Sequence, residues 1–93
     1  MNLLSLKKIA IYPNPVNKNE PLNIDFFNIS TGTYQIRLLN ASGQLFYSFQ
    51  KQITFPKETE QIHLNEKMSA GIYLLQVVDD KKRVVQTSKV IVQ

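Results

Sequence analysis

The stretch Gly71-Ile72-Tyr73-Leu74-Leu75-Gln76-Val77-Val78-Asp79 decides the fold of this chain. Tyr73, Leu75 and Val77 stand at every second position, which places their side chains on one face of an extended strand. The stretch holds one aromatic and three β-branched residues, which favour strands, and it is enclosed by Gly and Asp, which favour turns. It therefore predicts a β-strand with one buried face.

The same two-residue period recurs along the chain. It is clean in residues 22–26 and 34–38, whereas Pro13, Pro15 and residues 55–57 interrupt it. Short strands at this spacing, without a convincing helix, predict an all-β fold, an immunoglobulin-like antiparallel β-sandwich of about seven strands. The predicted strands cover residues 9–12, 22–26, 34–38, 44–53, 61–64, 71–79 and 83–92, and residues 65–70 form a link with room for one helical turn. The residues expected to be buried between the sheets are Tyr34, Ile36, Leu38, Tyr73, Leu75 and Val77.

Residues 32–40 and 71–79 share a pattern, because each segment enters a strand through Gly-x-Tyr and leaves it through Asn or Asp. We interpret them as two similar hairpins. In many β-sandwiches a Tyr near the start of a late strand bonds its hydroxyl to upstream backbone. Tyr73 fits this tyrosine corner and equally fits an ordinary half-buried strand aromatic. Gly43 and Gly71 stand where the chain turns into a strand, and a positive φ is expected there.

The chain has 93 residues, which corresponds to one domain. We divide it into residues 1–8, a linker remnant or the artificial start of an excised domain, and residues 9–93, the domain itself. The start does not resemble a signal peptide, because its positive charges follow a short apolar part. No stretch reaches the length of a membrane span, so membrane insertion is not expected.

The net charge of +4 is compatible with an anionic partner. The charges are scattered, however, and the one basic run, Lys81-Lys82-Arg83, is expected to be a solvated turn. Aromatic residues near Lys and Arg stand mostly at core-facing positions. Packing therefore explains them better than base stacking does, and nucleic-acid binding is not expected.

Residues for catalysis or metal binding are sparse. His63 is the one histidine, and the chain has no Cys, so no metal site and no Ser-His-Asp arrangement can be assembled from recognisable motifs. Asp79 and Asp80 lack the regularly spaced oxygen ligands of a calcium loop. We therefore expect no enzyme activity, no cofactor and no metal.

A set of motifs in a fixed order carries a resemblance to a known family. The set is Tyr12-Pro13-Asn14-Pro15, then Gly32, Tyr34, Asn40 and Gly43, then Gly71 and Tyr73, and finally Lys89-Val90-Ile91-Val92. With these motifs the chain resembles the C-terminal sorting domain, type A, of the type IX (Por) secretion system of Bacteroidetes. The resemblance covers residues 9–93, nearly the whole chain.

The resemblance implies a sandwich that directs an N-terminal cargo domain from the periplasm across the outer membrane, so that the protein is secreted or stays on the cell surface. It implies recognition by the type IX translocon and its shuttle proteins, and removal by a surface sortase-like cysteine peptidase. In the family the last residues are needed for export. The implied recognition residues are Lys89, Val90, Ile91, Val92 and Gln93.

One departure from the family concerns the turn before the last strand. Many members have Gly there, whereas this chain has Asp79-Asp80-Lys81-Lys82. Because Asp tolerates left-handed geometry better than most residues do, we expect a longer or differently shaped loop.

Two interpretations of the terminal strand stay open. In the first, residues 89–93 are the part of the export signal that a receptor recognises, either through a free strand edge or through a charged and apolar tip. In the second, Val90, Ile91 and Val92 only complete the core. A different class of function also stays open, namely an adhesive or carbohydrate-binding accessory module. The absence of Trp counts against sugar stacking.

Overall fold

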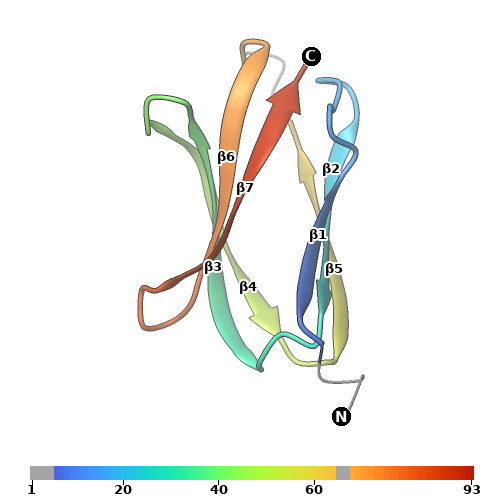
Figure 1. The fold of residues 1–93 in the computed structure, drawn as a ribbon, viewed down its shortest axis with the longest axis vertical. Coiled ribbons are helices and arrows are strands. Elements are labelled where there is room, and N and C mark those ends of the chain that lie inside the picture. Colours follow the sequence, from blue (N-terminus) through green and yellow to red (C-terminus); the bar gives the residue numbers. More distant parts are fainter. Residues whose placement is uncertain (1–5, 65–67) are drawn as a thin grey trace.

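The computed structural model describes residues 6–64 and 68–93 and has seven strands in two antiparallel sheets that face each other (Figure 1). One sheet has the order β1-β2-β5 and the other the order β4-β3-β6-β7. The strands are β1 Lys8–Tyr12, β2 Pro21–Phe27, β3 Gly32–Asn40, β4 Leu45–Ile53, β5 Lys57–His63, β6 Gly71–Val78 and β7 Val84–Val92. The predicted antiparallel β-sandwich is therefore confirmed.

The core lies between the sheets and follows the two-residue period. Leu22, Ile24 and Phe26 of β2 are almost fully buried, as are Leu75 and Val77 of β6. Each fully buried large apolar side chain stabilises the fold by about 1.5–3 kcal/mol. The six residues expected in the core are all buried, which confirms the predicted strand register.

The predicted fifth strand, residues 61–64, is too short. β5 begins at Lys57, within the expected break at residues 55–57. Its first half looks polar because Glu58 and Glu60 point toward Lys51 of β4, whose Nζ lies 3.4 Å and 3.3 Å from their carboxylates. Because Glu58 and Glu60 occupy inward positions near the edge of the sandwich, the alternation of apolar and polar residues is not visible in this part of the sequence. In the predicted link after β5, residues 65–67 lie outside the described residues.

The two predicted hairpins share their hydrogen bonds. The Tyr73 hydroxyl donates to the Ser69 carbonyl at 2.7 Å, and the Tyr34 hydroxyl donates to the Ser30 carbonyl at 2.6 Å. Tyr73 is therefore a tyrosine corner rather than a half-buried aromatic, and Tyr34 makes a second one. The same local geometry pins the start of both central strands of the larger sheet.

The turns that end these hairpins are also alike. Asn40 Oδ1 accepts from the backbone N–H groups of Ser42 and Gln44, and Asp79 Oδ1 accepts from those of Lys81 and Arg83. Such Asx turns let the side chain replace a backbone partner.

The turn at residues 79–82 has the same form as the first Asx turn, and the expected difference from family members that have Gly here stays a prediction. Gly43 has φ 90° in the first turn, and Lys82 has φ 65° at the equivalent position of the second. Lys82, rather than an Asp, adopts the left-handed conformation. The expected positive φ is confirmed at Gly43 and also at Gly71, where φ is 152°.

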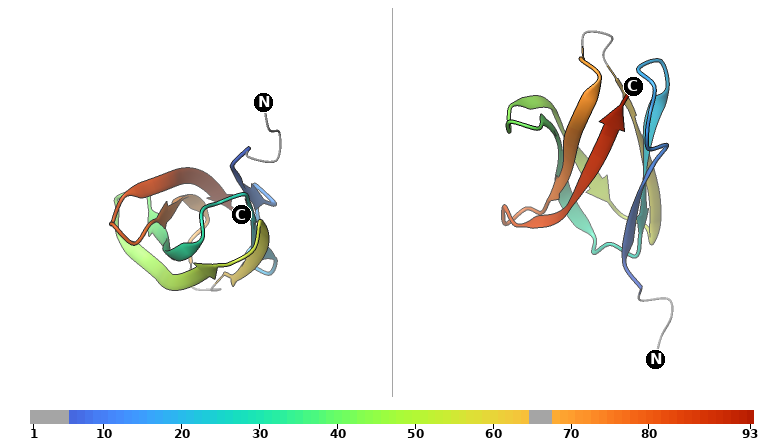
Figure 2. Two further views of the ribbon diagram at one scale, coloured as in Figure 1. Left: turned by 90° about the horizontal axis from the view of Figure 1, so that it is seen from below. Right: turned by 45° about the horizontal axis from the view of Figure 1, so that its top comes forward.

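The edges of the two sheets lie next to each other, β7 beside β1 and β4 beside β5 (Figure 2). The Gln86 amide of β7 donates to the Ile9 carbonyl of β1 at 3.1 Å. Lys51 of β4 donates to the Thr59 carbonyl of β5 at 3.3 Å. β1 starts at the end of the sandwich opposite to the one where β7 ends (Figure 1).

Candidate functional site: the terminal strand and its clasp

β7 carries the sequence-predicted recognition residues. It is an edge strand of the larger sheet and pairs with β6 in antiparallel register, with Ile91 opposite Ile72 and Lys89 opposite Leu74. Val90 and Val92 point into the core and are 0% and 2% exposed, whereas Lys89, Ile91 and Gln93 are exposed. The strand thus divides into an inward face that packs and an outward face that meets solvent.

Asn14, between the two prolines of the first motif, holds the free edge of β7. Its Nδ2 donates to the Lys89 carbonyl at 2.8 Å, and its Oδ1 accepts from the Ile91 N–H at 2.9 Å. The primary amide thus offers the strand one donor and one acceptor, as a neighbouring peptide group in a sheet does. A single side chain here acts in place of an eighth strand.

The next residues continue this pairing through the backbone. The Val16 N–H donates to the Ile91 carbonyl and the Gln93 N–H donates to the Val16 carbonyl, both at 2.9 Å, which makes a parallel bridge. Val16 itself is fully buried. We call residues 12–16, together with the part of β7 that they contact, the C-terminal clasp.

Tyr12 anchors the clasp to the smaller sheet. Its hydroxyl donates to Asp25 Oδ2 at 3.0 Å, and its carbonyl accepts from the Asn23 amide at 3.2 Å. The hydrogen bond to the Asp25 carboxylate raises the pKa of Tyr12 above its ordinary value. The Tyr-Pro-Asn-Pro motif therefore joins both sheets, through Tyr12 on one side and Asn14 on the other.

The clasp limits how the terminal strand can be recognised. β7 lies on a sheet edge, but Lys89, Ile91 and Gln93 already have intramolecular partners for the backbone groups named above. A receptor strand that pairs with this edge has to displace Asn14 and Val16 first. The outward side chains of β7 are accessible without any such change.

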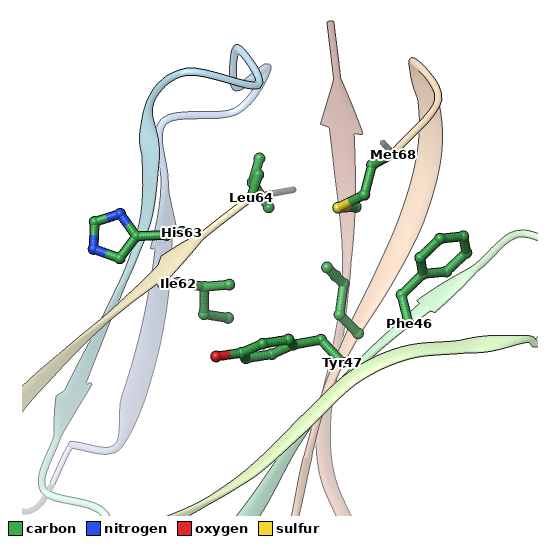
Figure 3. A pocket seen from close by; sticks show the side chains of 7 residues that line it. Phe46, Tyr47, Ile62, His63, Leu64 and Met68 are labelled. Atoms are coloured by element: carbon green, nitrogen blue, oxygen red, sulfur yellow. The ribbon is translucent and has the colours of Figure 1, made fainter. Parts of the chain in front are cut away.

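An apolar pocket of about 320 Å³ opens between the sheets at the end of β5 (Figure 3). Ile62, Leu64 and Met68 face it together with Phe46 and Tyr47 of β4, and His63 points to the other side of β5. The described residues contain no group of three or more side chains that fits a metal ion. Most of the side chains that line the pocket are apolar.

Several aromatic side chains are partly exposed. Phe46 and Tyr47 are nearly half exposed although they face the pocket between the sheets, and Phe55 is 65% exposed. The cause at Phe46 is a bulge, where the register between β3 and β4 shifts at Leu38 and Leu39.

Among the residues that the structure describes, no helix could cross a membrane.

The chain is similar to known proteins in its sequence and in its fold. The family described as secretion system C-terminal sorting domain matches residues 10–93. No curated protein matches the chain. A solved structure of PorZ, an essential bacterial surface component of the type-IX secretion system of Porphyromonas gingivalis, has a similar fold, with a TM-score of 0.61 and 16% sequence identity.

The PorZ match covers 91% of this chain and 11% of the PorZ chain, and at this identity it shows the fold alone. The family match covers more than half of this chain and includes both the Tyr-Pro-Asn-Pro motif and the whole of β7. The chain therefore belongs to the family of secretion system C-terminal sorting domains.

Proposed function

We propose that this domain is the type IX export signal of a larger protein that is secreted or displayed on the cell surface. The family match over residues 10–93 is the observation that carries the proposal. The cargo lies N-terminal to the domain and reaches the outer membrane through the periplasm. The translocon and its shuttle proteins recognise the folded domain, and a surface sortase-like cysteine peptidase then removes it.

The arrangement of the chain suits such a signal. β1 begins at the end of the sandwich that lies away from the clasp (Figure 1), so a cargo domain that precedes β1 leaves the clasp accessible. The outward residues Lys89, Ile91 and Gln93 are held in place by the clasp on one side and by β6 on the other. We propose that these residues carry the address, while Val90 and Val92 keep the strand in the core.

The proposal is tested by fusing residues 1–93 to the C-terminus of a periplasmic reporter in a type IX-competent bacterium. We expect the reporter in the medium or on the cell surface, and its retention in a strain that lacks the translocon. Equal export by both strains, or retention in both, would contradict the proposed function. An adhesive or sugar-binding module predicts retention in both strains.

The part played by the clasp is tested with Asn14→Ala. Two hydrogen bonds of about 1 kcal/mol each are lost, so the domain stays folded with a lower free energy of unfolding. We expect faster hydrogen exchange at the Ile91 amide and weaker export. Asn17→Ala is the matched control, because its side chain is not part of the clasp. Unchanged export by Asn14→Ala, with faster exchange at Ile91, would show that the clasp is not needed for export.

A further inference from the structure

The outward face of the larger sheet carries an apolar row that crosses all four strands. Leu39 of β3 stands opposite Leu45 of β4 on one side and Leu74 of β6 on the other, and Ile72 of β6 stands opposite Ile91 of β7. Leu39 is buried although it lies outside the core cluster between the sheets. Leu45, Ile72 and Ile91 are 48%, 47% and 37% exposed. We call these five residues the outer row.

The charges on this face all have one sign. β3, β4, β6 and β7 contain no Asp or Glu, and their charged residues are Arg37, Lys51 and Lys89. Lys51 turns to the rim and pairs with Glu58 and Glu60. Arg37 and Lys89 stand on the outward face, and within the described part of the chain neither forms a salt bridge. Two uncompensated cations therefore accompany the outer row.

Side chains and a neighbouring loop contact both edge strands next to this face. Asn14 and Val16 occupy the edge of β7, and Lys51 bridges the edge of β4 to β5. Charged residues and covering loops are the usual means by which proteins prevent strand addition at an edge. At the C-terminal end of β7, a partner therefore meets the side chains of the face before it meets free backbone groups.

We propose that the outer row, together with Arg37 and Lys89, docks a partner protein whose contact surface has an apolar strip bordered by carboxylates. The inference rests on the proposed export function, and it states the surface chemistry of the export component that binds the domain. The terminal strand contributes Ile91 and Lys89 to this surface, and β6 contributes Ile72 and Leu74.

Two other occupants fit the face less well. Recognition of an anionic lipid surface usually takes clusters of about 4–8 cationic residues, whereas this face carries Arg37 and Lys89. A second copy of the chain, docked through the same face, brings cations to cations with no carboxylate from any of the four strands. An acidic protein partner satisfies both the apolar row and the charges.

The test uses the reporter fusion and two sets of variants. In the charge set, we expect Lys89→Arg to be exported like the wild type, Lys89→Gln less, and Lys89→Glu about tenfold less. In the apolar set, Ile72→Thr combined with Ile91→Thr keeps both residues β-branched and is expected to reduce export about tenfold. The matched controls are Lys81→Glu in an exposed turn and Val84→Thr combined with Val85→Thr at the other end of β7, and we expect them to be exported normally.

Thermal unfolding of each variant shows that a loss of export is not a loss of folding. Export of the outer-row variants at the wild-type level, with the wild-type domain exported, overturns this inference and leaves the proposed function intact. No type IX-dependent export of the wild type overturns the proposed function itself. Equal losses in the control variants also overturn the inference.

Two measurements on the purified 93-residue chain address the other occupants. Sedimentation with phosphatidylglycerol vesicles that Lys89→Glu abolishes would assign the face to an anionic lipid surface and overturn the inference. A dimer in analytical ultracentrifugation that the Ile72→Thr and Ile91→Thr changes dissociate would assign it to a second copy and overturn it too. We expect a monomer that does not sediment with the vesicles.

Discussion

At the scale of single residues, the two Asx turns show what one backbone conformation demands. Asn40 and Asp79 organise their turns through the same backbone bonds, and the third residue after each has a positive φ. The first turn uses Gly43 at this place and the second uses Lys82. Only Gly adopts this region without a steric penalty from a Cβ.

Exchanging these residues should therefore shift stability in opposite directions. We expect Lys82→Gly to raise the free energy of unfolding by about 1 kcal/mol and Gly43→Lys to lower it by about the same amount. Urea unfolding at neutral pH measures both. Lys81→Gly is the control, because Lys81 is not among the residues with positive φ, and it should stabilise nothing. A destabilised Lys82→Gly would contradict the argument.

Asp79 also makes the second turn sensitive to acid. The backbone N–H of Arg83, with further help from its side chain, holds the pKa of Asp79 below its ordinary value. A lowered pKa in the folded state gives stability that is present above the unfolded pKa of about 3.9 and is lost as the pH falls through the folded pKa. The wild type should lose this contribution in strong acid.

Asp79→Asn should remove that acid sensitivity while the turn keeps its shape, because Asn40 makes the same backbone bonds in the first hairpin. At neutral pH we expect the variant to be less stable than the wild type, since the ion pair with Arg83 is gone. The difference should shrink toward roughly pH 2. Urea unfolding at both pH values measures it, and a difference that stays constant would contradict the assignment.

At the scale of elements, β7 has two faces with different tasks. Val90 is fully buried, and Val90→Ala should cost about 2 kcal/mol through lost burial and the cavity left behind. Ile91 is partly exposed, and Ile91→Ala should cost less than about 1 kcal/mol. Thermal and urea unfolding separate the two variants. Equal costs would show that the strand packs through both faces.

The two faces of β7 also explain why deletion of residues 89–93 is a poor test of the address. The deletion removes Val90 and Val92 from the core together with the outward side chains. Unfolding then accounts for any loss of export. Substitution of outward residues alone keeps the inward contacts in place.

At the scale of the whole molecule, the sandwich closes both of its open sides. Gln86 and the clasp join β7 to β1 and the loop that follows it, and Lys51 joins β4 to β5. The backbone N–H groups of Thr54 and Phe55 hold the pKa of Glu58 below its ordinary value, so that its carboxylate is charged when it meets Lys51. Unpaired edges invite association with other chains, and these contacts tie each edge strand to the neighbouring sheet.

Lys51→Met should expose one of these sides. The variant keeps most of the side chain's length, but it loses the charge that pairs with Glu58 and Glu60 and the hydrogen bond that ties β4 to β5. We expect concentration-dependent association in light scattering and sedimentation, with the monomer still folded. Lys81→Met in the exposed turn is the control and should stay monomeric. A monomeric Lys51→Met variant would show that other contacts protect this edge.

The sequence by itself determined the fold class, most strand positions and the inward residues, because the two-residue period is a local property of the chain. Gly43 was interpretable from its place in the turn for the same reason, whereas at Tyr73 the spacing left two interpretations open. The first half of β5 escaped notice, since Glu58 and Glu60 face Lys51 across the sandwich rather than an apolar core.

Only the tertiary structure decided how the recognised motifs work together. Asn14 and Lys89 are 75 residues apart, and no local pattern indicates that an amide between two prolines holds the edge of the last strand. The outer row likewise depends on the register of β3, β4, β6 and β7, which sets which side chains become neighbours. Strand register and the contacts at the strand edges depend on pairing between segments that are far apart in the sequence. No local sequence pattern therefore reveals them.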